Sequence, residues 1–127
     1  MEFYFPTELD EQLAFGAAAL AAVMGLVLMF APGIALRFFG LQPRDGRPEG
    51  FAEIRSMGGF YIGFGLGALL LAQPMVYLAL GAGFALALFG RILSMASDHG
   101  ATFRNYLLLI VQALLAALPL GYALGWI

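Results

Sequence analysis

The sequence contains no cysteine and no lysine, and few of its residues carry a charge. The lack of cysteine excludes disulfide bonds, thiolate catalysis and cysteine-ligated metals. Only 11% of the residues are charged, whereas about 25% are charged in an ordinary soluble domain. With 62% hydrophobic residues in a chain of 127, polar side chains are too few to cover the surface of a soluble domain. The composition therefore indicates an integral membrane protein.

The few charges lie in short windows, which leave three charge-free stretches, 12–36, 56–90 and 105–127. A spanning helix needs about 20 apolar residues, so the first and last stretches each fit one span. The middle stretch is too long for one helix and is broken at Gln73-Pro74, where proline can begin a new helix. We therefore expect one membrane domain over 1–127, an all-α four-helix bundle that runs antiparallel, up and down, with short loops. Its expected spans are about 10–34, 52–72, 75–97 and 103–124.

Two local patterns predict further detail. Thr7, followed three residues later by Asp10, resembles a capping box and predicts a helix start. The segment 37–41 (RFFGL) is short and amphipathic, which predicts that it lies at the membrane interface.

The arginines predict the orientation in the membrane. With four spans, all six arginines fall on the side of the loops 37–51 and 98–102 or at its membrane edge. The positive-inside rule then places both loops in the cytoplasm and both termini outside.

Small residues recur along each expected span, and membrane helices pack closely through such residues. In the second span they lie on two sides, which predicts contacts with two neighbours. The bundle could use all of these faces internally, or one could bind a second copy or a larger complex. The glycines expected to pack are Gly58, Gly59, Gly63, Gly65, Gly67, Gly83 and Gly90.

Charged residues at one end of the second and third spans predict a polar cluster. Arg55 and Arg91 each lie 18 residues from Gln73, which is about 27 Å along a helix and near the edge of the hydrocarbon. Glu53 lies about 3 Å further out, so we expect Arg91 to approach it within salt-bridge distance.

Other polar groups extend this cluster or stand apart from it. Asp98 and Arg104 lie at a nearby depth and could join it, whereas Gln112 lies near mid-membrane and is expected to form hydrogen bonds between helices. Long arginines at helix ends can have a structural role, or the cluster can hold a ligand, a proton or a lipid headgroup. His99 stands in a loop with one nearby carboxylate, which is a poor metal site, so no metal is expected.

Several of these residues form a family-like pattern. Glu53-Ile54-Arg55, Gly58-Gly59-Phe60-Tyr61 and Gly90-Arg91-Ile92-Leu93-Ser94 resemble a small bacterial four-helix membrane family, domain of unknown function 4345. This family is more distantly similar to DoxX-like membrane proteins. The resemblance implies a multi-pass protein of the bacterial cytoplasmic (inner) membrane, and the arginine distribution then predicts that both termini are periplasmic. It names no substrate, and His99 departs from the pattern, in which Asp and Gly are adjacent.

Three functions are therefore considered. The first is a non-catalytic accessory or structural subunit that packs against a larger membrane complex or against itself. The second is binding or transport of an anionic lipid or small metabolite by Glu53, Arg55 and Arg91. The third is a quinone-linked redox partner of the DoxX-like kind. We expect no enzymatic activity, no nucleic-acid partner and no cofactor other than a lipid or a quinone, because no set of catalytic residues is evident.

Overall fold

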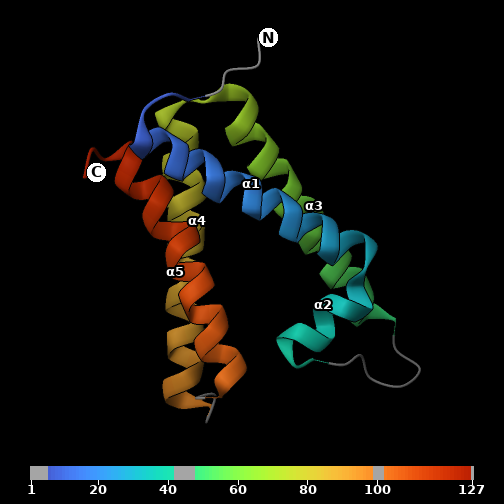
Figure 1. Ribbon diagram of the computed structural model, residues 1–127. Helices are drawn as coiled ribbons and strands as arrows, with labels where there is room; N and C mark the ends of the chain where they lie inside the picture. The colour runs from blue at the N-terminus through green and yellow to red at the C-terminus, as the bar shows by residue number, and fades with distance from the viewer. Residues whose placement is uncertain (1–5, 42–47, 99–101, 127) are drawn as a thin grey trace.

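The structure is a computed structural model that describes residues 6–41, 48–98 and 102–126, and these residues are helical apart from short connections. Four of the helices are long and apolar enough to cross a membrane, which indicates a multi-pass membrane protein and confirms the number of expected spans. A short fifth helix, α2, lies between the first two of them (Figure 1). The helices are α1 (Leu9–Phe30), α2 (Pro32–Phe39), α3 (Glu49–Leu71), α4 (Pro74–Ser97) and α5 (Phe103–Ala123).

Proline sets two of the helix boundaries. Pro74 begins α4 directly after Gln73, and Ala72 takes a left-handed conformation with φ of 50° to close the turn from α3. Pro32 begins α2, so the first span ends at Phe30 and not near residue 34 as expected. The physical reason is that proline has no backbone N–H to continue the hydrogen-bond ladder of α1.

The start of α1 differs from the predicted capping box. Glu8 is the N-cap residue, and its side chain makes no capping hydrogen bond. The Asp10 carboxylate instead accepts a hydrogen bond from the backbone N–H of Glu11, and the Gln12 amide donates to the carbonyl of Pro6. The prediction that Thr7 caps the helix is therefore wrong.

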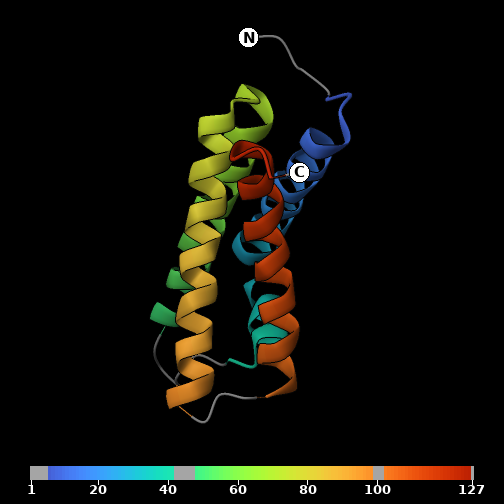
Figure 2. The same cartoon turned by 90° about the vertical axis from the view of Figure 1, so that its left-hand side faces the viewer.

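The spanning helices pack as two pairs, α1 with α3 and α4 with α5 (Figure 1). The pairs meet where α1 contacts α5, near the turn at Gln73, which we call the turn end of the molecule. They diverge toward the opposite end, which holds α2 and the last turn of α4 and which we call the loop end. Figure 2 shows the same arrangement from the side, with α4 and α5 next to each other along their length.

Glycine lets the backbones of α1 and α3 touch. A Cβ atom placed on Gly58 would lie 2.6 Å from the carbonyl oxygen of Gly25, and one on Gly65 would lie 2.7 Å from that of Ala18. No side chain fits in such a contact, so α3 uses this side against α1. On α4, the close approach to α5 is made by Gly81, where a Cβ atom would lie 2.6 Å from the Leu120 side chain.

As expected, α3 contacts more than one helix, since it touches α4 and α2 as well as α1, but the described residues leave its second glycine side largely open. A Cβ atom on Gly63 or Gly67 would meet nothing within 4 Å, and one on Gly59 would touch only the end of the Met29 side chain. Gly83 and Gly90 of α4 are equally open. The spacing of these glycines predicted a packing strip, but spacing does not specify which side of a helix faces a neighbour.

The core has two parts. At the turn end, small side chains of α1 pack with larger ones from the other spanning helices, including Tyr77, Phe84 and Leu115. At the loop end, Leu28 of α1 packs with α2 and with Ile54 of α3. The first part joins both helix pairs, whereas the second joins only α1, α2 and α3.

Candidate functional site

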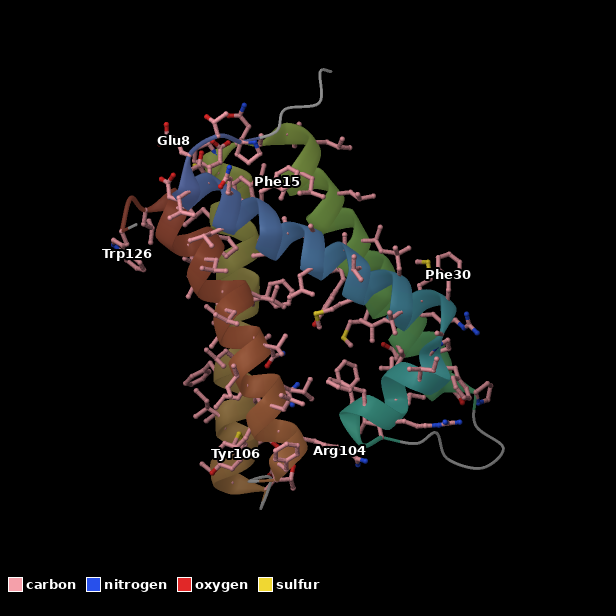
Figure 3. All side chains as sticks on the ribbon, in the orientation of Figure 1. Glu8, Phe15, Phe30, Arg104, Tyr106 and Trp126 are labelled. Atoms are coloured by element: carbon pink, nitrogen blue, oxygen red, sulfur yellow. The ribbon has the colours of Figure 1, made fainter. Side chains whose placement is uncertain are left out.

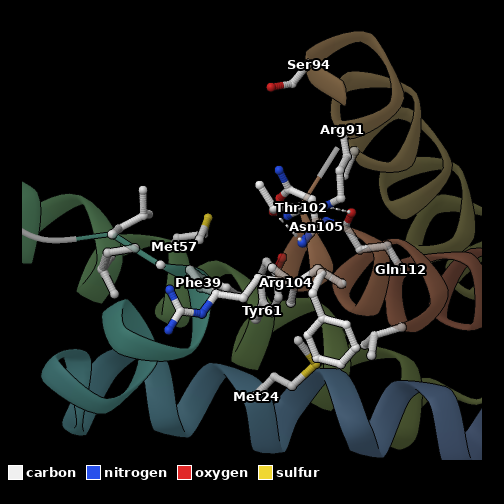
Figure 4. A pocket seen from close by; sticks show the side chains of 17 residues that line it. Met24, Phe39, Met57, Tyr61, Arg91, Ser94, Thr102, Arg104, Asn105 and Gln112 are labelled. Carbon is white, nitrogen blue, oxygen red and sulfur yellow. Dashed lines mark hydrogen bonds between the residues drawn. The ribbon is translucent and has the colours of Figure 1, made fainter. Parts of the chain in front are cut away.

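Between the two helix pairs lies a cavity of about 870 Å³, which we call the chamber (Figure 4). It is located at the loop end, where the pairs diverge, and every helix contributes to its wall. Met24 of α1, Phe39 of α2 and Met57 of α3 form part of its apolar side. Its polar lining residues are Tyr61, Arg91, Ser94, Thr102, Arg104, Asn105 and Gln112.

Arg91 is held in the chamber by two amides of α5. Its Nε donates a hydrogen bond to Gln112 Oε1 at 2.7 Å, and its Nη1 donates to Asn105 Oδ1 at 2.7 Å (Figure 4). Both acceptors lie on one face of α5, two turns apart, and Gln112 is buried. The guanidinium is thus fixed in direction, and two of its five N–H donors are used in these bonds.

Arg104 approaches the chamber from the first turn of α5. In Figure 3 its side chain extends from α5 toward α2. It passes over Gly40, where an added Cβ atom would lie 3.0 Å from Nη1 of Arg104. Gly40 has a φ of 75°, a left-handed conformation that suits glycine, and it ends α2. Among the described residues, Arg104 has no hydrogen bond or ion pair.

The charged groups that line the chamber are all positive among the described residues. Two guanidinium groups, those of Arg91 and Arg104, line it, and none of the described lining residues is a carboxylate. The remaining polar groups are hydroxyls and amides. Positive charge beside a wall of Met, Phe and Ile side chains acts in a low-dielectric environment, where it attracts an anion more strongly than in water.

The prediction that Arg91 pairs with Glu53 is wrong. Glu53 is exposed on α3 and is not among the lining residues, so the expected pair with Arg91 is not formed. The depth of the two residues is compatible with a contact, but α3 and α4 diverge toward the loop end, where both residues lie (Figure 1). Asn105 and Gln112 of α5 take its place.

The structure also separates other members of the predicted cluster. Arg55 donates from Nη1 to the carbonyl of Met29 at 2.6 Å, which satisfies a backbone acceptor in the last turn of α1. Asp98 is exposed just after α4. Only Arg91 and Arg104 of the five predicted residues come together in the chamber. The prediction on His99 lies outside the described residues.

Sequence reasoning did not assign four of the polar chamber residues to a site, namely Tyr61, Ser94, Thr102 and Asn105. Tyr61 of α3 lines the chamber, and its ring contacts that of Phe84 edge to face, with centroids 5.3 Å apart. Thr102 lines it too, and its side chain caps α5 by accepting from the backbone N–H of Asn105. A signal was present for Asn105, because it shares a helix face with Gln112 at a spacing of two turns.

No family model matches the chain, and no curated protein or solved structure matches it either. The resemblance to the four-helix family therefore stays a prediction.

Proposed function

We propose that this protein is a multi-pass membrane protein that binds an anionic ligand in the chamber. The observation that carries the proposal is the pair of arginines, Arg91 and Arg104, in a cavity of about 870 Å³ whose described lining has no carboxylate. The volume falls in the range of about 300–1,000 Å³ that is usual for small-molecule sites.

The chemistry of the lining fits a phosphate or carboxylate group. Guanidinium presents planar, paired N–H donors that match both anions. The amides of Gln112 and Asn105 direct Arg91, and hydroxyls from Ser94 and Thr102 lie in the same wall. Because these groups donate hydrogen bonds and supply charge, they support recognition of an anion in preference to catalysis.

A cation without a counter-charge has a high free energy in apolar surroundings, and this also favours binding of an anion. A charge inside a membrane usually pairs with an opposite charge or faces water. Arg91 has two neutral acceptors and Arg104 has none among the described residues. A bound anion would supply the counter-charge that the lining lacks.

The proposal includes an orientation. We infer an antiparallel, up-and-down order of the four spans, with the loop end in the cytoplasm and the termini on the other side. The arginine distribution supports it through the positive-inside rule. The chamber would then open at the cytoplasmic side of a bacterial inner membrane and would take its ligand from the cytoplasm or the inner leaflet.

Binding of radiolabelled glycerol 3-phosphate to protein in zwitterionic nanodiscs tests the proposal. Arg104→Gln should weaken binding about tenfold or more, since a charge-assisted hydrogen bond contributes about 1.5–3 kcal/mol. Arg104 has no partner among the described residues, so this variant should fold normally. Arg37→Gln is the matched control, because Arg37 is exposed on α2 outside the chamber. Equal affinity in the two variants, or no binding to the unaltered protein, would refute the proposal.

A second candidate function, that of an accessory subunit or homo-oligomer, is favoured by the open glycine side of α3. Gly59, Gly63 and Gly67 lie with Phe60, Phe64 and Val76 of α4 along a shallow groove that no described residue fills. Such a surface allows close approach of another membrane helix. Gly63→Leu should then break up an assembly in mild detergent, while Gly90→Leu, at an equally open position, should not. A monomeric protein in which both variants behave alike would exclude this function.

A further inference from the structure

A second, apolar cavity lies beside the chamber, between α3 and α4. It measures about 340 Å³, and we call it the side groove. The two cavities have three lining residues in common, Met57, Tyr61 and Ala87. The side groove therefore begins where the chamber ends, with these three side chains as the partition. Its other lining residues are Phe60, Phe64, Ala79, Leu80, Gly83 and Phe84.

The floor of the side groove follows one face of α4. Ala79, Gly83 and Ala87 succeed one another at every fourth residue, and Arg91 is the next position in the series. Residues four apart lie one above the other on a helix, so the small side chains form a track that leads away from Arg91. From Arg91 to Ala79 the track is about 18 Å long at 1.5 Å per residue. At Gly83 the track is open, since an added Cβ atom would meet nothing within 4 Å.

We propose that the ligand of the chamber is an anionic amphiphile whose apolar chain lies in the side groove. This inference rests on the proposed function, because the head of the amphiphile is the anion held by Arg91 and Arg104. The chain would pass Ala87, between Tyr61 and Met57, and continue toward Gly83. All ligands of this class have one anionic head group, a phosphate or a carboxylate, attached to a long apolar chain.

The direction of the track supports this ligand class. The arginines lie at the loop end, and the side groove runs from there toward the turn end. An amphiphile so placed has its head near one membrane surface and its chain toward mid-membrane, as in a lipid leaflet. The molecule could therefore enter sideways from the leaflet, between α3 and α4, without turning its polar head through hydrocarbon.

Contact between the side groove and ordinary lipid is expected in any membrane, so the test must depend on the charge of the head. The probe is lysophosphatidic acid with a diazirine in the middle of its chain, added to protein in zwitterionic nanodiscs. After photolysis, mass spectrometry of peptides locates the label. A monoacylglycerol with the same chain is the neutral counterpart, and a diazirine fatty acid distinguishes a carboxylate head from a phosphate head.

We expect lysophosphatidic acid to label the segment of α3 with Phe60 and Phe64 or that of α4 with Ala79. The neutral probe and the Arg104→Gln variant should each give about tenfold less label there, the effect of one lost charge-assisted contact. Gly83→Leu should fill the groove and reduce the label at least tenfold. Gly90→Leu adds the same side chain at an open position of α4 that lines neither cavity, and it should leave the label unchanged.

The two proposals can fail separately. If the neutral probe labels the side groove as strongly as the anionic one, the chain there belongs to ordinary lipid and the inference is overturned. Label that persists in Gly83→Leu also overturns it. In either case, binding of glycerol 3-phosphate that still depends on Arg104 would leave the proposed function standing, while loss of both signals would remove both proposals.

Discussion

The contact between α1 and α3 makes a quantitative prediction about Gly58. In Gly58→Ala, the new methyl group would lie 2.6 Å from the carbonyl oxygen of Gly25, 2.6 Å from the backbone nitrogen of Met29 and 2.9 Å from the Leu28 Cβ. Carbon atoms prefer separations of about 3.5–4.0 Å. The helices must therefore move apart by about 1 Å at this point, because backbone atoms, unlike the end of a side chain, cannot rotate out of the way.

The cost follows from packing. A gap of about 0.5–1 Å removes about a quarter to a half of the dispersion energy of the atoms that face it. Overpacking of this kind typically costs about 1–3 kcal/mol. Alanine also forms a helix more readily than glycine by about 1 kcal/mol. Gly63→Ala carries the same propensity gain at an open position of α3, so the difference between the two variants isolates the contact. Gly58→Ala should be about 1–3 kcal/mol less stable than Gly63→Ala.

The free energy of unfolding can be measured by titrating protein in mild-detergent micelles with sodium dodecyl sulfate and following helicity by circular dichroism. Gly65→Ala should behave like Gly58→Ala, because a Cβ atom there would lie 2.7 Å from the carbonyl oxygen of Ala18. A difference of less than about 0.5 kcal/mol between Gly58→Ala and Gly63→Ala, which is typical of a surface substitution, would show that α1 and α3 are not in backbone contact.

Three other predictions concern different parts of the chain. Gln112→Leu removes an acceptor of Arg91 and should destabilise the protein by about 1–3 kcal/mol in the same titration; unchanged stability would mean that the bond contributes nothing. The Tyr77 hydroxyl is buried and has no hydrogen-bond partner among the described residues, so Tyr77→Phe should leave stability equal or raise it by up to about 1 kcal/mol. A clear loss would reveal a partner for the hydroxyl. In this cysteine-free chain, single cysteines at Glu8 and Glu49 should react with a membrane-impermeant reagent from opposite sides, and labelling from one side would contradict the proposed orientation.

The spans could be predicted from the sequence because their cause is local. Charges are excluded from hydrocarbon, so the charge-free stretches mark the helices, and Gln73-Pro74 marks the turn. The end of the first span was missed at Pro32 because the apolar run continues through Ile34 and hides the break. Composition alone cannot distinguish one span of this length from a span followed by a short separate helix.

The site was harder to predict because it depends on how the helices are placed as well as on the depth of each residue. Residue counting gave Arg91 and Glu53 similar depths, but depth does not specify how far apart two helices lie at that level. A related limit applies to the glycines, since spacing places Gly58 and Gly63 on different sides of α3 but does not specify that only the side with Gly58 packs closely. The face shared by Asn105 and Gln112 was the better guide, because two amides on one side of an apolar helix need a polar partner.

The position of the chamber follows from the size of the side chains along α1, which are small toward the turn end and larger toward the loop end. From its first turns to its middle, Ala14, Ala18 and Ala21 are fully buried, so the other spanning helices can come close at the turn end. In its second half, Met24 lines the chamber, and the facing wall carries Tyr61 of α3 and Arg91 of α4. Long side chains at this depth hold the pairs apart in the way that small ones draw them together. The size of the side chains along the helices therefore sets the distance between the two helix pairs. This distance is greatest at the loop end, where the arginines lie.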